Sequence, residues 1–317
     1  MNRVAILGAG AWGTALAVQA TRAGAAVTLW ARDPAPIAGT RENPRLPGIR
    51  LPDSVAVTGT LPGAGQDALL LTIPLAALRG LLDRIAPAGP LVVCAKGVEQ
   101  GSLRLPLEIV AARHPGVACA VLTGPNFARE VALGLPTASV IAAADAGLRQ
   151  RLIGLLGTPG FRLYGNDDPM GAQVGGAAKN VVAIAAGAVI GAGLGENARA
   201  ALVTRGLAEI GRLAVALGGR AETVAGLSGL GDLLLSCAGP TSRNYALGLA
   251  LGRGESLDSA LAAGRGVVEG VATAPALVAR AGDLDLPICR AVAALVSGRL
   301  TLGEAVAALL ARPLRDE

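Results

Sequence analysis

The sequence predicts an α/β chain in which an N-terminal, doubly wound parallel sheet is followed by an all-helical C-terminal domain. Short apolar, β-branched segments typical of buried parallel strands alternate with helical patterns up to about residue 170. Beyond Asp168-Pro169 the strand pattern stops, and the remaining chain repeats apolar residues at helical spacing. We therefore expect two domains, residues 1–170 and 171–317.

The first strand and helix are joined by a glycine motif. Arg3–Leu7 has a buried-strand pattern, GAGAWG follows at 8–13, and Thr14–Ala23 has a helical pattern. In this order the glycines allow a tight turn, close approach of the backbone to a pyrophosphate and close helix–strand packing. The helix N-terminus then faces the phosphates. The motif predicts a Rossmann dinucleotide-binding domain with Gly8, Gly10 and Gly13 at the cofactor; the alternative is a glycine turn that binds nothing.

The residues after the second strand bear on the choice of cofactor. Ala26–Trp30 reads as that strand, and Arg32-Asp33 follows it. At this position an acid usually binds the ribose hydroxyls of NAD, whereas an Arg accommodates the 2′-phosphate of NADP. Because Arg32 comes first, the sequence favours NADPH over NADH.

Further strands should place several polar or glycine-rich segments at one edge of the sheet. The expected strands are Ala68–Ile73, Leu91–Ala95, Cys119–Leu122 and Ala138–Ala142, with helices over Leu75–Ile85 and Leu105–Arg113. Ligands bind such sheets at the carboxyl ends of the strands. The segments that follow strands, and so should line this crevice, are Ile73-Pro74, Lys96-Gly97 and Gly124-Pro125-Asn126.

The helical half begins with a long Ala- and Gly-rich stretch, residues 171–218, broken near Gly191–Gly195 into two helices. No charged side chain lies between Lys179 and Glu196, so most of the first helix should be buried, with Lys179 at its edge. The chain has 28 Lys plus Arg, of which only Lys96 and Lys179 are lysines. Lys can release its proton and Arg cannot. Lys179 is therefore a candidate acid/base. Its ammonium should lie over Gly175 and Gly176 of the preceding turn, where no side chain would block a ligand. The alternative is a lysine that extends from a core helix to water.

Three further segments of the helical half carry polar groups. Residues 226–232, GLSGLGD, form a flexible turn that ends in the carboxylate of Asp232. Residues 241–244, TSRN, combine a hydroxyl, a guanidinium and an amide just before a helical pattern, which favours a phosphate site. The alternative for this segment is a helix N-cap with a solvent-facing Arg243. The third segment is 266–270, GVVEG.

Composition excludes several other classes of protein. The four cysteines show neither metal-ligand nor disulfide spacing, so we expect a reduced, cytoplasmic protein and no metal. The apolar run after Asn180 is too short and glycine-rich for an integral membrane segment, and the N-terminus enters a strand pattern without a signal peptide. Net charge is +5 without a basic run, so nucleic acid is not an expected partner and a small anionic ligand is.

Taken together, these segments resemble the bacterial type of the NAD(P)-dependent glycerol-3-phosphate dehydrogenase family. The stretches that carry the resemblance are GAGAWGTALA at 8–17, AKG at 95–97, GPNFAREVALGLPTA at 124–138, KNVVAIAAG at 179–187, GENARAALVTRGLAEIGRLA at 195–214, GLSGLGDL at 226–233, SRN at 242–244 and VVEGV at 267–271. They span nearly the whole chain. The resemblance implies a homodimer that reversibly reduces dihydroxyacetone phosphate, a phosphorylated triose, to sn-glycerol 3-phosphate for phospholipid synthesis.

The resemblance also implies roles for individual residues. Lys179 would be the proton acceptor. Substrate contacts would come from Lys96, Gly124, Asn126, Lys179, Asp232, Ser242, Arg243 and Asn244. Cofactor contacts would come from Ala11, Trp12, Arg32, Lys96, Ala128, Arg243, Val267 and Glu269. Asn126 departs from the Ser or Thr common in the family, which could alter one hydrogen bond to the substrate.

The expected chemistry agrees with the residues. Hydride transfer to a ketone builds negative charge on oxygen, which the Lys179 ammonium can stabilise and then protonate. Burial would favour its neutral amine and a nearby Asp232 the ammonium, a balance that the sequence leaves open. His114, the single histidine, falls in an expected loop, which argues against a histidine-based mechanism.

Two other functions are compatible with parts of the pattern. A β-hydroxyacid dehydrogenase or a ketopantoate-type reductase shares the architecture and also places a lysine on the first long helix of the helical domain. Lys96 together with Ser242-Arg243-Asn244 argues against both, because two cations suit a phosphate dianion. A non-catalytic dinucleotide sensor would have no use for Lys179.

Overall fold

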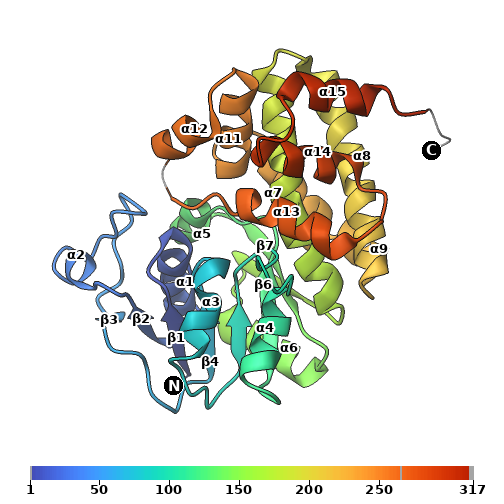
Figure 1. Ribbon diagram of the computed structural model, residues 1–317. Coiled ribbons are helices and arrows are strands. Elements are labelled where there is room, and N and C mark those ends of the chain that lie inside the picture. Colours follow the sequence, from blue (N-terminus) through green and yellow to red (C-terminus); the bar gives the residue numbers. More distant parts are fainter. Residues whose placement is uncertain (1, 265, 314–317) are drawn as a thin grey trace. The chain divides into compact units, whose positions relative to one another are not determined.

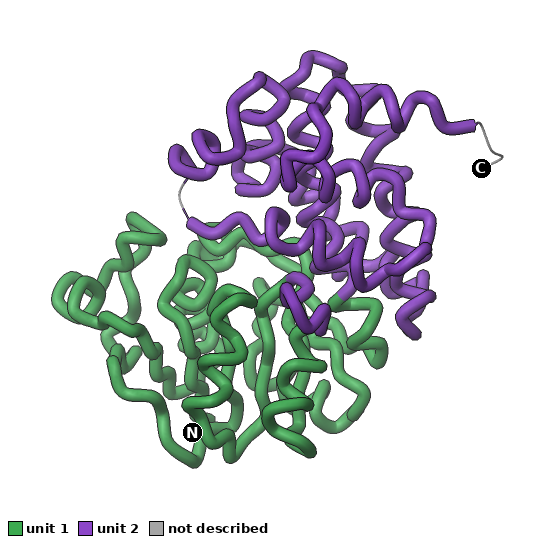
Figure 2. The backbone as a smooth tube through the Cα atoms, viewed as in Figure 1, with its two compact units in different colours: residues 1–96, 105–173 green, residues 97–104, 174–317 purple. Residues whose placement is uncertain are grey.

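A computed structural model describes residues 2–264 and 266–313 of the chain (Figure 1). The chain divides into two compact units: unit 1 comprises residues 1–96 and 105–173, and unit 2 comprises residues 97–104 and 174–317 (Figure 2). Unit 1 contains the whole sheet and unit 2 is helical, as the sequence predicts. The segment 97–104 belongs with the helical unit, although it lies between two elements of unit 1 in the sequence.

Unit 1 is built on an eight-stranded sheet in the order β3-β2-β1-β4-β5-β6-β7-β8. The strands are β1 (Arg3–Leu7), β2 (Ala26–Trp30), β3 (Ala56–Thr58), β4 (Ala68–Leu71), β5 (Leu91–Val93), β6 (Cys119–Thr123), β7 (Thr137–Ala142) and β8 (Phe161–Asn166). Each strand predicted from the sequence is present. The sheet is parallel, as predicted, except between β6 and β7, which run antiparallel.

The sequence patterns missed β3 and β8, the two edge strands. β3 has three residues and none of them is buried; β8 buries only Phe161 of its six and contains a glycine. An edge strand packs against fewer neighbours, so it needs little of the apolar patterning by which a strand is recognised.

Helices cover both faces of the sheet, because successive residues of each strand point to opposite sides. Val4 and Ile6 of β1 belong to a core cluster with residues of α1 (Ala11–Arg22) and α6 (Ala146–Leu156). Ala5 and Leu7 belong to a second cluster with α3 (Leu75–Leu82) and α4 (Pro106–Arg113). The two short remaining helices of the unit are α2 (Ala35–Ala38) and α5 (Ala128–Leu133). Unit 1 is therefore a three-layer α/β/α structure.

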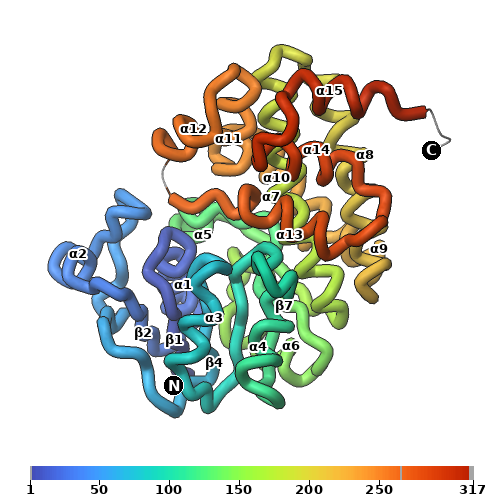
Figure 3. Tube along the Cα trace, viewed as in Figure 1, coloured from blue at the N-terminus to red at the C-terminus, as the bar shows by residue number. Residues whose placement is uncertain are grey.

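Two long helices, α7 and α8, begin the helical part of the chain (Figure 3). Its helical elements are α7 (Pro169–Gly191), α8 (Gly195–Ala216), α9 (Ala221–Ala225), the π-helical turn η1 (Leu227–Gly231), α10 (Asp232–Cys237), α11 (Arg243–Gly252), α12 (Leu257–Ala263), α13 (Glu269–Ala281), α14 (Pro287–Val296) and α15 (Leu302–Leu310). The predicted break after Gly191 is confirmed. Gly193 and Gly195 lie there with φ of 72° and 87°, a conformation that glycine adopts without a steric penalty.

Helix α7 is a core helix. It is long and apolar enough to cross a membrane, but 83% of its apolar window is buried within the protein. It packs against α11 with backbone almost in contact: a Cβ added at Gly187 would lie 2.0 Å from the Tyr245 carbonyl oxygen, and one at Gly248 would lie 1.9 Å from that of Ile184. This close packing fixes the position of the residues that α7 carries.

Candidate active site

Lys179 lies in a buried polar cluster with residues of α10. Its Nζ is 2.9 Å from Oδ1 of Asp232 and donates a hydrogen bond of 2.7 Å to Oγ of Ser236. Lys179 is 9% exposed, Asp232 2% and Ser236 3%. The prediction that most of this helix is buried is confirmed, because residues 171–189 of α7 are buried. Lys179 was expected at the edge of the buried stretch, and this was wrong, because it lies in the middle of it. An ammonium buried to this degree and held by a carboxylate and a hydroxyl is not a lysine that extends to water.

Gly175, one turn before Lys179, has a different role from the one we expected. We expected Gly175 to clear space under the ammonium for a ligand, and this was wrong. A Cβ at Gly175 would lie 2.8 Å from the carbonyl oxygen of Ser228, so the backbone of η1 fills that space. The small residue lets η1 approach α7. This approach carries the start of α10, and with it Asp232, to Lys179.

Ser236 was not predicted from the sequence. It lies four residues after Asp232 on α10, and residues four apart lie on the same face of a helix. This spacing is the signal that could have found it once Asp232 was singled out. Cys237 follows it, and burial raises the pKa of its thiol to about 12, despite the opposing charges of Lys179 and Arg199. Cys237 therefore remains a neutral thiol beside the cluster.

A second buried network joins three helices next to Lys179. Asn244 of α11 donates from Nδ2 to Oδ1 of Asn180 at 2.9 Å, and its Oδ1 accepts the N–H of Gly270 at 3.0 Å. Asn180 is the residue after Lys179 and was also missed by the sequence analysis. Gly270 has no room for a side chain, because a Cβ would lie 2.6 Å from Oδ1 of Asn244. The predicted substrate residue Asn244 thus fixes α11 and α13 to α7.

The start of α11 has the N-cap and the exposed Arg243 that the sequence offered as the alternative to a phosphate site, and the phosphate site itself stays a prediction. Ser242 is the N-cap, and its Oγ accepts the N–H of Tyr245 at 3.4 Å. Arg243 is exposed, and its guanidinium lies against Gly266, where an added Cβ would be 2.7 Å from Nη1. Val267 is half exposed, and Glu269 begins α13. Arg243, Val267 and Glu269 are therefore close along one surface of unit 2.

In unit 1 the predicted glycine turn connects β1 to α1. Gly8 has φ of 123°, and a Cβ at Gly13 would lie 1.9 Å from the carbonyl oxygen of Gly8, so the helix packs directly on the turn. A Cβ at Gly10 would meet nothing within 4 Å. The turn is thus closed on the protein side and open in front of Gly10, at the N-terminus of a 12-residue helix. These residues fit a dinucleotide pyrophosphate.

Arg32 and Asp33 follow β2, as predicted, and both are exposed. Oδ1 of Asp33 accepts the N–H of Ala35 at 3.2 Å, at the start of α2. One of the two oxygens of the Asp33 carboxylate therefore accepts a backbone N–H, and the neighbouring Arg32 is exposed.

The other predicted residues of unit 1 also follow strands. Lys96 lies past β5, half-buried, and near the Cys94 thiol, as does Trp12. Burial raises the pKa of Cys94 to about 12, against the smaller effects of a Trp12 hydrogen bond and the Lys96 charge. Gly124 has φ of 131° after β6, and Ala128 begins α5.

Asn126, the departure from the family pattern, is engaged within unit 1. Its Oδ1 accepts the hydroxyl of Ser139, which is fully buried on β7, at 2.6 Å. One of its polar atoms is therefore committed to the protein, and its amide nitrogen remains as the group that could reach a ligand.

No group of three or more His, Cys, Asp or Glu side chains that could hold a metal ion occurs within the described ranges, 2–264 and 266–313. The four cysteines are free thiols. Unit 1 carries a dinucleotide turn, and unit 2 carries a buried lysine cluster.

A glycine turn that fits a dinucleotide and a buried lysine cluster are features typical of a dinucleotide-dependent oxidoreductase. Residues 3–148 match the family described as NAD-dependent glycerol-3-phosphate dehydrogenase N-terminus, and residues 168–307 match the corresponding C-terminus. The chain belongs to the NAD-dependent glycerol-3-phosphate dehydrogenase family.

Individual relatives agree over their full lengths. The chain is 56% identical over 319 residues to glycerol-3-phosphate dehydrogenase [NAD(P)+] of Acidiphilium cryptum, covering 99% of this chain and 98% of that protein. It is 52% identical to the enzyme of the same name from Gluconobacter oxydans, with 98% and 97% covered. The crystal structure of glycerol-3-phosphate dehydrogenase from Coxiella burnetii superimposes with a TM-score of 0.93 at 38% identity, covering 98% and 99% of the two chains.

The ketopantoate-type reductases, one of the alternatives considered from the sequence, are less similar to this chain. A ketopantoate reductase structure from Ralstonia eutropha shares 19% identity at a TM-score of 0.59, which shows a common fold alone.

Proposed function

We propose that this protein reversibly reduces dihydroxyacetone phosphate to sn-glycerol 3-phosphate with NAD(P)H, and so supplies glycerophospholipid synthesis. The observation that carries the proposal is the buried Lys179–Asp232–Ser236 cluster in a chain 56% identical to a glycerol-3-phosphate dehydrogenase. We further propose a cytoplasmic homodimer, on the strength of the family resemblance and the free thiols.

Lys179 performs the proton transfer in this proposal. The bound dinucleotide supplies the hydride. As hydride reaches the carbonyl carbon, charge grows on the oxygen, and the Lys179 ammonium stabilises it and gives it the proton. In the oxidation direction the neutral amine accepts the hydroxyl proton. Asp232 and Ser236 hold Nζ in one position, so that the proton is presented at a fixed point.

Cationic groups recognise the phosphate in this proposal. Arg243 is exposed at the N-terminus of α11, where the guanidinium and the helix N–H groups both favour an anion. Lys96, the other lysine of the chain, is the second cation. We assign the remaining predicted contacts as the resemblance gives them: Gly124, Asn126, Ser242 and Asn244 to the substrate, and Ala11, Trp12, Ala128, Val267 and Glu269 to the cofactor.

NADPH is the preferred cofactor in this proposal. Arg32 comes directly after β2 and is exposed, so its guanidinium could pair with a 2′-phosphate, while one oxygen of the Asp33 carboxylate accepts the N–H of Ala35. A charge-assisted bidentate contact is worth about 1.5–3 kcal/mol, which corresponds to roughly a ten- to hundredfold preference.

Steady-state oxidation of NADPH and NADH tests the proposal. The wild-type protein should turn over dihydroxyacetone phosphate far better than dihydroxyacetone or a 2-keto acid. Arg243→Ala should weaken the use of the phosphorylated substrate much more than any use of the unphosphorylated one. Efficient turnover of ketopantoate, or no turnover of dihydroxyacetone phosphate with either cofactor, would contradict the assignment.

A further inference from the structure

The loop between α2 and β3 is fastened to the glycine turn by one side chain. We call residues 40–55 the strap. Leu46, Ile49 and Leu51 of the strap are buried in the same core cluster as residues of α1. Arg41 holds its ends together, because its N–H groups donate to the carbonyl oxygens of Pro52 and Val55. The strap is therefore a packed part of unit 1.

Asn43 is the buried polar residue of the strap, at 2% exposure. Its Nδ2 donates to the carbonyl oxygen of Ala9 at 3.0 Å and to Oγ1 of Thr14 at 2.6 Å. Its Oδ1 accepts the N–H of Arg45 at 2.9 Å. The orientation of the amide follows from its partners, because the Ala9 carbonyl can only accept and the Arg45 N–H can only donate.

The two acceptors lie on either side of the glycine turn. Ala9 stands between Gly8 and Gly10, and Thr14 lies in the first turn of α1, fully buried, with its N–H bonded to the Gly10 carbonyl at 3.0 Å. In a planar trans peptide the C=O and the following N–H point in opposite directions. Because the Ala9 carbonyl is turned to Asn43, the Gly10 N–H points away from the strap.

We propose that Asn43 is a positioning residue for the dinucleotide: its amide sets the Ala9–Gly10 peptide and the first turn of α1 so that their N–H groups face the pyrophosphate. The turn cannot fix the orientation of its own N–H groups, because a glycine-rich backbone has many conformations of similar energy. A turn fixed before the ligand arrives loses less entropy on binding. The inference rests on the dinucleotide site of the proposed function.

The test is NADPH binding to the whole protein, measured by fluorescence titration or calorimetry beside steady-state kinetics. Asn43→Ala should raise the Kd of NADPH about tenfold, the loss expected for an ordering hydrogen bond pair. The KM for NADPH should rise in parallel, while kcat at saturating NADPH and the KM for dihydroxyacetone phosphate stay within about threefold.

Arg41→Met is the matched control. It releases the strap at Pro52 and Val55 without touching Ala9 or Thr14. It should lower the melting temperature and leave the Kd of NADPH within about twofold. If Asn43→Ala behaves in the same way as Arg41→Met, Asn43 merely fastens the strap and the proposal is overturned.

If Asn43→Ala does not fold, Thr14→Val tests the same proposal. It is nearly isosteric and removes one of the two acceptors of Asn43. It should raise the Kd of NADPH about threefold, and an unchanged Kd contradicts the proposal. If the wild-type protein binds no dinucleotide at all, the proposed function fails instead, so the two failures are distinguishable.

Discussion

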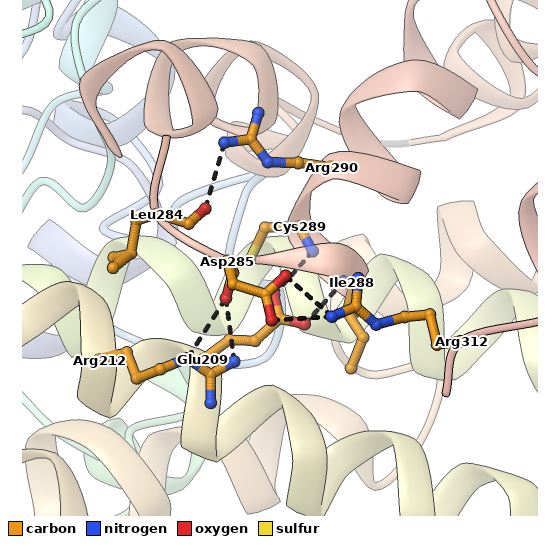
Figure 4. Close-up of polar contacts among 8 residues, drawn as sticks. All are labelled: Glu209, Arg212, Leu284, Asp285, Ile288, Cys289, Arg290 and Arg312. Atoms are coloured by element: carbon orange, nitrogen blue, oxygen red, sulfur yellow. Dashed lines mark hydrogen bonds and ion pairs between the residues drawn. The ribbon is translucent and has the colours of Figure 1, made fainter. Parts of the chain in front are cut away.

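Asp232 and Glu209 are both buried carboxylates of unit 2, but they face different partners. Asp232 is 2% exposed and lies 2.9 Å from the Lys179 ammonium. Glu209 of α8 is 1% exposed, and its two oxygens accept the N–H groups of Ile288 at 2.7 Å and Cys289 at 3.0 Å (Figure 4). The two carboxylates are buried to the same degree, but a side-chain cation stabilises Asp232 and two backbone N–H groups stabilise Glu209.

Glu209 replaces a missing helix cap. The N-cap of α14 is Leu286, whose side chain accepts no hydrogen bond, and Pro287 has no N–H, so the first donors of the helix are at 288 and 289. Glu209 satisfies both from another helix. Three residues later Arg212 donates to the carbonyl oxygen of Asp285, and Arg312, beyond α15, pairs with the Asp285 carboxylate. This region joins α8 to α14 and to the end of the described chain.

The difference shows what marks a buried carboxylate as functional. Burial alone does not, because both side chains have it. What distinguishes a functional carboxylate is its partner, because a lysine ammonium can give up a proton and a backbone N–H cannot. Four predictions test this division, in order of decreasing size.

The largest effect is expected from Lys179→Arg. The guanidinium keeps the charge beside Asp232 but stays protonated at any usable pH, so turnover should fall by about 10²–10⁴. NADPH binding, read by fluorescence, should survive because unit 1 is unchanged. A variant that keeps more than about a tenth of wild-type kcat would remove Lys179 as the acid/base and leave Lys96 as the candidate.

Glu209→Ala should produce the opposite pattern. Removing the carboxylate leaves two buried N–H groups without an acceptor, which costs about 2–4 kcal/mol of unfolding free energy. The kcat per folded molecule should stay within about threefold. Urea denaturation and kinetics on the same samples measure both. Glu222→Ala, an exposed carboxylate of the same unit, is the control and should change stability by no more than about 0.5 kcal/mol. A large fall in kcat for Glu209→Ala would contradict the division.

The pH dependence of stability gives a smaller signal. Burial raises the pKa of the Glu209 carboxyl above its ordinary value of 4.5, although the N–H groups of Cys289 and Ile288 and the charge of Arg212 oppose this. Between 4.5 and the raised value the folded state holds more protons than the unfolded state, so the unfolding free energy falls as pH rises.

This contribution is isolated by comparison with Glu209→Gln, which has no carboxyl to titrate. Urea denaturation at pH values from about 4 to 7 should show the wild type losing stability relative to the variant as pH rises through this interval. A difference that is constant with pH would show that the N–H groups balance burial, and one that grows in favour of the wild type would show that they outweigh it; either result would contradict the prediction.

The smallest effect is expected at the exposed end of the same region. Arg312 and Asp285 pair at 2.8 Å, with side chains 37% and 44% exposed. Solvent and salt screen such a pair, so Arg312→Ala should cost less than about 0.5 kcal/mol, and less still at high salt. Thermal or urea denaturation at two salt concentrations measures this. A loss of unfolding free energy as large as that of Glu209→Ala would mean that the Arg312–Asp285 pair is essential to the stability of the helical unit.

Local patterns in the sequence were enough for most elements of the fold. The alternation of strands and helices, the glycine turn after β1 and the break after Gly191 depend on residues close together in the chain, where backbone preference and periodicity act directly. Motifs spread over the whole chain led to the family, which the comparisons confirm. The individual roles of the site residues stay predictions until variants are measured.

Other features needed the tertiary structure. The antiparallel pairing of β6 with β7 and the edge strands β3 and β8 depend on neighbours in space and leave weak local patterns. Lys179 meets Asp232 because Gly175 lets the backbone of Ser228 approach, an arrangement of segments more than fifty residues apart. Asn43 looks like a loop residue in the sequence, yet its amide reaches Ala9 and Thr14. Packing determines which hydrogen bonds and ion pairs form between distant segments. The sequence therefore identified Lys179 and Asp232 as candidate groups, but only the folded chain showed that they meet and that Ser236 joins them.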